Sequence, residues 1–241
     1  MTSNRFVISS LILGLAAVLS TFIISGTLRK IKSENQTINV TGSAKKVMVS
    51  DLGILRGTIS AQGATASDAY RALQAQKPIL VEYIRSKGFP ADKINFQTIS
   101  NYPVYNYNQN GQQLDIRAFI ASQMIDIQSG DVQLIKAISL EISSLVEKGV
   151  NFQVNQPEYY YTKAGDIKIE IQAEAAKDAM IRGQRIAKAT GRELGTLKSA
   201  RMGVLQITPE NSNMTSDYGI NDVSSIRKEI TAVVNANFEI D

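Results

Sequence analysis

The chain begins with an uncharged apolar run at residues 6–24, which reads FVISSLILGLAAVLSTFII. As a helix, a run of this length extends roughly 28 Å, close to the hydrocarbon thickness of a bilayer. A buried helix of a soluble protein rarely stays apolar on all faces over such a length. We therefore expect one transmembrane helix. The side chains expected to contact lipid are Phe6, Leu11, Leu15, Leu19, Phe22 and Ile24.

A cleaved signal peptide is the competing interpretation of this run. Signal peptides usually have an apolar region of about 7–15 residues followed by a small-residue cleavage site of the A-x-A kind. Here the apolar run is longer, and residues 23–27 (IISGT) fit such a site poorly. The sequence therefore favours an uncleaved anchor, formed by residues 1–32 with their basic flank, ahead of a domain at residues 33–241.

The charges are concentrated next to the anchor. The chain has 26 Lys and Arg against 22 Asp and Glu. Removing Arg5, Arg29, Lys30 and Lys32 leaves 22 basic and 22 acidic residues, so the domain is neutral. Nucleic-acid binders need a concentrated basic face, and we therefore expect no nucleic-acid partner.

The sequence contains neither Cys nor His. Ser-His-Asp and Cys-His nucleophile systems are therefore impossible, as are disulfides and the usual zinc and haem sites. The carboxylates Glu170 and Glu174 are four residues apart in an expected helix, which is typical of solvated ion-pair positions. We expect no catalytic residue, no cofactor and no metal.

The domain alternates between extended and helical patterns. In order, we expect extended segments at 37–40 and 46–61, a helix at 67–87 capped by Ser67 and kinked or split at Pro78, a hairpin at 93–128, a helix at 131–148, a strand at 150–161, a helix at 166–190, a strand at 194–207, a polar loop at 209–225 and a last strand at 230–240. Residues 33–241 could form one large domain or two small ones.

The order of these elements from 46 to 161 is β-α-β-β-α-β, the pattern of split-βαβ, ferredoxin-like layers. A further long helix and two strands follow. The expected fold class is α+β, with a ferredoxin-like core preceded by one transmembrane helix. In the long helix, the residues expected on the packed seam are Ile169, Ala173, Ala176, Met180, Gly183 and Ala187.

The hairpin is the clearest supersecondary feature, because Asn-Gly at 110–111 is the strongest short-range hairpin signal. Arms at 93–107 and 112–128 are each about three times the usual strand length. Such arms must bend at bulges, project from the body, or pair with another chain.

Several local strings, taken in order, resemble the SIMPL-domain family of bacterial envelope proteins. They are INVTGSA at 38–44, KGF at 87–89, DKI at 92–94, YPVY at 102–105 with the later Gly111, and AKATGRELG at 187–195. The resemblance covers residues 37–241. It implies an exported, often anchored protein that assembles into rings and has no established enzymatic activity, with some members associated with tolerance of oxidative stress.

The resemblance and the flanking charges predict opposite orientations. Three basic residues follow the apolar run and one precedes it, which by the positive-inside rule favours a cytoplasmic domain. The resemblance implies export, and large domains can cross despite flanking charge. We expect a single-pass protein of the cytoplasmic (inner) membrane, with its C-terminal domain on the periplasmic or extracellular side.

Tyrosines near the hairpin tip are the best candidates for an interface, because Tyr combines an apolar ring with a polar end. The candidate oligomer interface is Tyr102, Tyr105, Tyr107, Asn110 and Gly111. The run of tyrosines at 159–161 fits ordinary, half-buried strand positions better.

Three functions stay open. The favoured hypothesis is a non-enzymatic, membrane-anchored envelope protein whose partner is itself, in a ring-like homo-oligomer serving as a scaffold or channel-like assembly. The alternative is a monomeric anchored module that binds a ligand or partner in stress signalling, which a concave apolar pocket with polar groups would favour. An enzyme using carboxylates, Tyr or Lys would need a buried group with a strongly shifted pKa inside a cleft.

Overall fold

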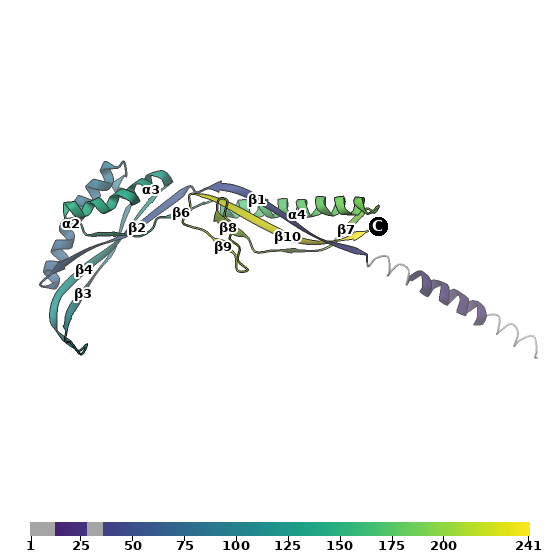
Figure 1. The fold of residues 1–241 in the computed structure, drawn as a ribbon, viewed down its shortest axis with the longest axis horizontal. Helices are drawn as coiled ribbons and strands as arrows, with labels where there is room; N and C mark the ends of the chain where they lie inside the picture. Colours follow the sequence, from purple (N-terminus) through teal and green to yellow (C-terminus); the bar gives the residue numbers. More distant parts are fainter. Residues whose placement is uncertain (1–12, 28–35) are drawn as a thin grey trace, which may run out of the picture. The chain divides into compact units, whose positions relative to one another are not determined.

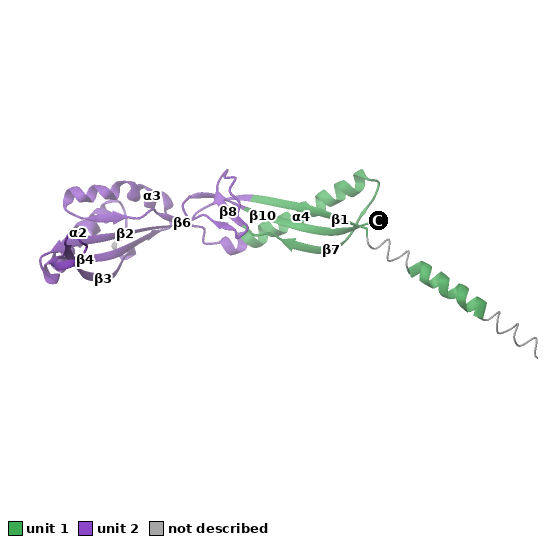
Figure 2. Cartoon of the chain, turned by 60° about the horizontal axis from the view of Figure 1, so that its bottom comes forward, with its two compact units in different colours: residues 1–45, 168–205, 231–241 green, residues 46–167, 206–230 purple. Residues whose placement is uncertain are grey.

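The computed structural model describes residues 13–27 and 36–241 (Figure 1). These residues form four α-helices and two β-sheets whose strands differ in length, which confirms the predicted α+β class. They fall into two compact units (Figure 2). Unit 1 takes in the chain up to residue 45, residues 168–205 and residues 231–241, and unit 2 takes in residues 46–167 and 206–230.

Unit 2 is built on an antiparallel sheet with the strand order β3-β4-β2-β5, and β6 also pairs with β2. Its elements are β2 (Leu52–Gly63), α2 (Ala66–Ser86), β3 (Ile94–Tyr107), β4 (Gln113–Ser129), α3 (Val132–Glu141), β5 (Phe152–Val154) and β6 (Glu158–Tyr160). Both helices pack on the sheet over a continuous core of Leu and Ile side chains, including Leu55, Ile59 and Ile125. Burial of these large side chains is the main source of this unit's stability.

The cap of helix α2 lies two residues earlier than predicted, and the helix is not split. Thr65, not Ser67, is the N-cap, and its side chain accepts a hydrogen bond from the Asp68 amide at 3.2 Å. The helix continues through Pro78, so the predicted division into two helices is wrong. Leu73 and Leu80 are fully buried on either side of the proline, and their packing holds both halves of the helix on the sheet despite the lost backbone bond.

Two predicted elements after the hairpin are shorter than expected. The helix predicted at 131–148 begins with Asp131 as its N-cap, which accepts from the amides of Gln133 and Leu134, but the α-helix ends at Glu141 and becomes the 3₁₀ helix η2 (Ile142–Lys148). The predicted strand at 150–161 is two short strands, β5 and β6, separated around Pro157. Proline cannot donate a hydrogen bond to a sheet, which explains the interruption.

The second sheet has the order β1-β10-β8-β9, with β7 also pairing with β10. Its strands are β1 (Thr37–Val49), β7 (Leu194–Met202), β8 (Gln206–Pro209), β9 (Ile220–Asn221) and β10 (Arg227–Ile240). The predicted extended run from 46 to 61 is therefore wrong as one strand, because β1 ends at Val49 and β2 begins at Leu52. The last strand predicted at 230–240 is confirmed as β10, and every second residue of it is buried: Ile230, Ala232, Val234, Ala236 and Phe238.

The helix α4 (Ala164–Ala189) packs along a different row from the predicted seam. The buried row is Ile167, Ile171, Ala175, Ala179, Gly183 and Ala187. Ile169 and Met180 are 71% and 40% exposed, so only Gly183 and Ala187 were placed correctly. In unit 1 a Cβ added to Gly42 would lie 2.2 Å from the Ala179 amide nitrogen. This backbone approach fixes the face of α4 that carries Ala175 and Ala179, and the predicted seam, which runs through Ala173, Ala176 and Met180 instead, is wrong over most of its length.

The predicted transmembrane run lies partly outside the described residues, since Phe6 and Leu11 precede residue 13. Residues 13–27 are helical, and Leu15, Leu19, Phe22 and Ile24 are all exposed on this helix. Within residues 13–27 and 36–241, no helix combines the length and the apolar character that a membrane span requires.

Candidate functional site

The strands β3 and β4 form the predicted hairpin, and a side chain in its turn fixes the connection. The Asn108 carboxamide oxygen accepts hydrogen bonds from the amides of Asn110 and Gln112, each at 2.9 Å. Gly111 has φ +75°, a left-handed conformation that side chains other than Gly rarely adopt. The Asn-Gly signal therefore identified both the turn and the residue that makes it possible.

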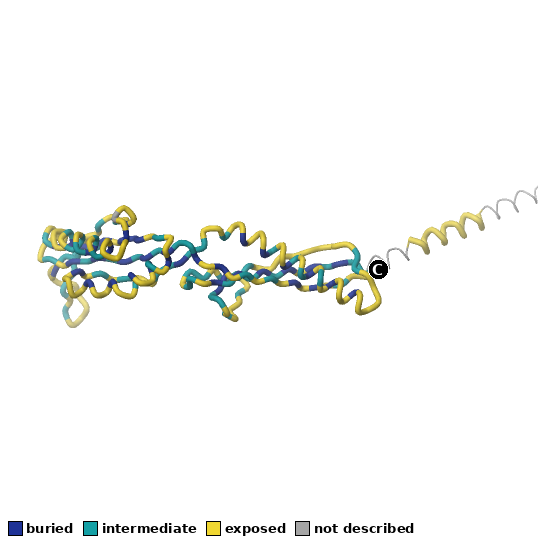
Figure 3. Tube along the Cα trace, turned by 90° about the horizontal axis from the view of Figure 1, so that it is seen from above, coloured by how far each residue is buried: buried dark blue, intermediate teal, exposed yellow. Residues whose placement is uncertain are grey.

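The two halves of this hairpin differ sharply in burial (Figure 3). At its base, Ile94, Ala121, Ile125 and Ile127 are buried in the core of unit 2. In the distal half, which we define as residues 101–117, no residue is buried. The pairing of β2 with β4 ends at Phe119, so residues 104–117 form a two-stranded ribbon, whereas residues 101–103 still pair with β4 residues that β2 flanks.

The distal half nevertheless carries apolar side chains. Tyr102 is 48% exposed, Tyr107 63%, Leu114 51% and Ile116 46%. Tyr105 is partly buried and lies opposite Ile116 in the strand register. Asn110 and Gly111 are exposed at the turn. The structure thus brings all five residues of the predicted interface into one ribbon, and adds Leu114 and Ile116 from the second arm.

The register of the ribbon is irregular, as its length predicted. Shifts occur between Phe96 and Ile99, between Val104 and Tyr105, and between Tyr105 and Tyr107. Two of these three lie in the distal half, where bulges increase the twist of a strand pair. The strand β3 also lies at the edge of its sheet and carries Pro103, a residue typical of edge strands.

A charged network lies on β2, β4 and β6 in unit 2. An Arg56 terminal nitrogen (Nη1) lies 2.7 Å from a Glu158 carboxylate oxygen, and its Nε lies 3.3 Å from Asp126. The Tyr160 hydroxyl donates to Glu158 at 2.6 Å. The hydrogen bond from Tyr160, with that from Arg56, lowers the pKa of Glu158. This carboxylate is therefore held ionised and engaged, which suits a structural ion pair better than a general acid.

A buried lysine is the feature that the sequence analysis missed. The Lys228 side chain is 3% exposed, and its Nζ donates to the Tyr159 carbonyl oxygen at 2.7 Å and to the Asp222 carbonyl. Burial lowers the pKa of Lys228. The bonds hold the polar loop after β8 against β6, within unit 2. Lys228 falls in the same alternating positions as the buried residues of β10, and this alternation could have predicted its burial from the sequence.

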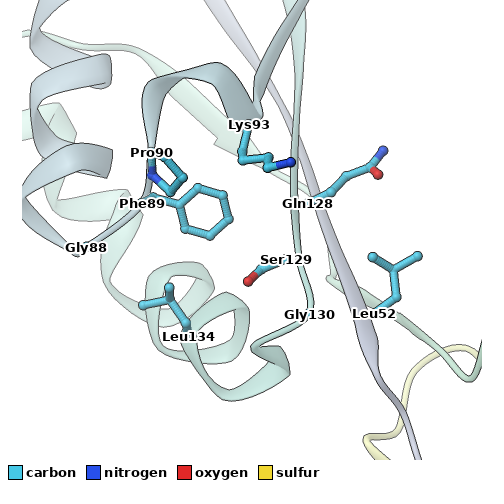
Figure 4. A pocket seen from close by; sticks show the side chains of 9 residues that line it. All are labelled: Leu52, Gly88, Phe89, Pro90, Lys93, Gln128, Ser129, Gly130 and Leu134. Atoms are coloured by element: carbon cyan, nitrogen blue, oxygen red, sulfur yellow. The ribbon is translucent and has the colours of Figure 1, made fainter.

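A small pocket of about 340 Å³ lies in unit 2 where the chain after α2, the end of β4 and the start of α3 meet (Figure 4). Phe89, Pro90 and Leu134 give it an apolar wall, and Lys93 and Ser129 contribute polar groups. Gly88, Phe89 and Lys93 of its lining belong to the strings at 87–89 and 92–94 that contribute to the family resemblance. The chain region that the structure describes contains no group of three acidic residues arranged to hold a metal ion.

The comparisons with known proteins point to one family. The SIMPL family model, described as a protein of unknown function (DUF541), matches residues 38–238. No relative was found among curated proteins. This match confirms the resemblance read from the sequence, and the family has no assigned enzymatic activity.

Solved structures add little. A candidate aminohydrolase from methicillin-resistant Staphylococcus aureus is 13% identical, with a TM-score of 0.25, over 53% of this chain and 32% of that one. A candidate amidohydrolase/peptidase from Burkholderia cenocepacia is 11% identical, with a TM-score of 0.21, over 51% of this chain and 29% of that one. The chain thus spans about a third of each, and likenesses this weak carry no argument about activity.

Proposed function

Because the chain belongs to the SIMPL family, whose members have no assigned activity, we propose that it is a non-enzymatic, membrane-anchored envelope protein that assembles with copies of itself. The distal half of the β3–β4 hairpin is the surface through which copies meet. The observation that carries this proposal is a ribbon with no buried residue that still exposes Tyr102, Tyr107, Leu114 and Ile116.

A second copy is the occupant that best fits this ribbon. A two-stranded ribbon without a covering layer is marginally stable in water, so it gains stability from any surface that covers it. The outer edge of β3 presents backbone groups that another strand can pair with. Tyrosine rings on such a ribbon supply apolar contact with a hydroxyl left free for hydrogen bonding. Repeated contacts of this kind close into a ring when the rotation between copies allows it.

The proposal has two further parts, one on the membrane anchor and one on the fold of unit 2. The apolar run at residues 6–24 anchors the protein in the cytoplasmic membrane, and the folded part lies on the periplasmic or extracellular side. In unit 2, the order β5-β2-β4-β3 with antiparallel neighbours supports a split-βαβ, ferredoxin-like core.

The absence of catalysis is also part of the proposal. The sequence has no Cys or His to act as a nucleophile or base. Hydrogen bonds and an ion pair engage the Glu158 carboxylate, and the buried Lys228 ammonium donates to the backbone carbonyls of Tyr159 and Asp222. These contacts support structural roles for the most perturbed groups of unit 2.

Mass photometry of the detergent-solubilised full chain tests the assembly. We expect a discrete species of several copies, and a shift towards the 26.3 kDa chain mass plus bound detergent in the double variant Tyr105→Ser with Tyr107→Ser. The matched control is Tyr218→Ser, because Tyr218 is 97% exposed but lies in a loop away from the hairpin. A wild-type monomer, or an equal loss of mass in the control, would contradict the proposal.

The pocket of Figure 4 favours a second candidate, a monomeric ligand-binding module. Its apolar wall with one ammonium and one hydroxyl matches the general character of small-molecule sites. Native mass spectrometry of the detergent-released full chain would then show an added small mass. Lys93→Gln and Leu134→Trp should remove it, whereas a single bare mass for the wild type would count against this candidate.

A further inference from the structure

A polar groove lies on the open face of the three strands of unit 1. Its volume is about 400 Å³, and its polar side chains are Asn39 and Thr41 of β1, Ser199 and Arg201 of β7, and Asn235 and Asn237 of β10. The alternate residues of these strands, such as Val40 and Ala236, face α4 instead. The groove is therefore on the sheet face that no helix of unit 1 covers.

The strand register sets these side chains in a regular grid. Asn235 lies opposite Arg201, and Asn237 lies opposite Ser199. On the other side, the Thr41 hydroxyl donates to the Asn235 carboxamide oxygen at 2.7 Å. Neighbouring strands are about 4.8 Å apart and alternate residues of one strand about 6.7 Å apart, so carboxamides and hydroxyls repeat at the scale of a sugar ring.

Two groups in the groove lack a partner in the part of the chain that the structure describes. The Asn237 carboxamide oxygen is buried and accepts no hydrogen bond. An orphaned buried acceptor is costly, and the Asn237 side chain that carries it lines the groove. The Arg201 guanidinium makes no ion pair with a described carboxylate, since Glu239 of the same sheet pairs with Lys198.

The charge of the groove selects the kind of ligand. None of its lining residues is acidic, so Arg201 gives it one uncompensated positive charge. Arg binds a carboxylate through two parallel hydrogen bonds. The carboxamides and hydroxyls both donate and accept, which is the pattern that the hydroxyls of a sugar require.

We propose that this groove binds an acidic saccharide, with a sugar carboxylate on Arg201 and ring hydroxyls on Asn237, Asn235 and Thr41. A neutral sugar would leave Arg201 unpaired, and a simple carboxylate would leave the carboxamides unused. The groove has no aromatic ring to stack on a sugar, so hydrogen bonds alone hold the ligand. The site is independent of the distal hairpin half and of self-assembly.

Calorimetric titration of the full chain, in a detergent without a sugar headgroup, tests the proposal. The probes are trigalacturonate, its methyl ester, a neutral galactose trimer and acetate. We expect trigalacturonate to bind at least about tenfold more tightly than any of the other three, since one charged bidentate pair contributes roughly that factor.

Two groove variants and one control make the test specific. Arg201→Gln and Asn237→Leu should each weaken trigalacturonate binding about tenfold or more, while Arg185→Gln, an exposed arginine of α4, should leave it unchanged. Because Arg201 is exposed, its variant is expected to fold, and a thermal melt checks this. No binding by the wild type, equal binding of the methyl ester or of acetate, or unchanged binding in Arg201→Gln would overturn the proposal.

Discussion

The base and the distal half of the β3–β4 hairpin belong to the same two strands but meet different surroundings. At the base, Ile125 and Ile127 are fully buried beneath α2 and α3. Beyond the last β2–β4 pair at Phe119, the same ladder continues as two strands and carries tyrosines on its surface. The buried base therefore supplies most of the hairpin's contribution to folding stability, and the exposed distal half can contact another molecule.

The largest loss of folding stability should come from truncating a buried side chain at the base of the hairpin. Ile125→Ala removes a fully buried side chain, and we expect the free energy of unfolding to fall by about 3–4 kcal/mol. The matched distal change, Ile116→Ala at a 46% exposed side chain, should cost less than about 1 kcal/mol. Urea denaturation measures both, and equal losses would break the comparison.

The second-largest loss of folding stability should come from replacing Lys228, which is also remote from the distal half. Lys228→Met leaves the Tyr159 carbonyl and the Asp222 carboxylate without their buried partner, so we expect a loss of about 2–3 kcal/mol. Its oligomeric mass should stay that of the wild type below the melting temperature. A stable variant with altered mass would show that the loop it secures takes part in assembly.

Acid should weaken unit 2 through its engaged carboxylates. Hydrogen bonds from Tyr160 and Arg56 lower the pKa of Glu158. At Asp51, burial by itself raises the pKa, but the hydrogen bonds from Thr162 outweigh burial, so the pKa of Asp51 is also lowered. A lowered folded-state pKa stabilises the fold above the ordinary values of 4.5 and 3.8, and this stabilisation is lost as the pH falls below them. The urea midpoint at pH 7, 5, 4 and 3 should therefore drop mainly in the last two steps. In Glu158→Gln the drop should be smaller, and an unchanged pH profile in this variant would remove Glu158 from the explanation.

The smallest effect on global stability should come from the turn. Asn108→Ala removes the acceptor of two amides in the distal half, and we expect about 1 kcal/mol or less in global unfolding. Amide resonances of residues 108–112 should shift while those of the base do not. A loss as large as that of Ile125→Ala would mean that the distal half is part of the cooperative core.

The sequence predicted features with a strong local cause. The Asn-Gly turn depends on two adjacent residues, and the strand β10 was recognised from a simple alternation along the chain. Features set by tertiary contact were missed. The α4 seam depends on the close approach of Gly42, and the burial of Lys228 depends on carbonyls from distant segments. The hairpin tyrosines could be placed on one ribbon because the turn signal is local, whereas the groove on unit 1 needed the register of three strands.

Hydrogen–deuterium exchange of the full chain at increasing protein concentration tests the covering of the distal half most directly. If another copy covers residues 101–117, their amides become progressively protected as concentration rises, while the exchange of buried base residues such as Ile125 stays constant. Exchange in the distal half that is equally fast at every concentration would contradict the account.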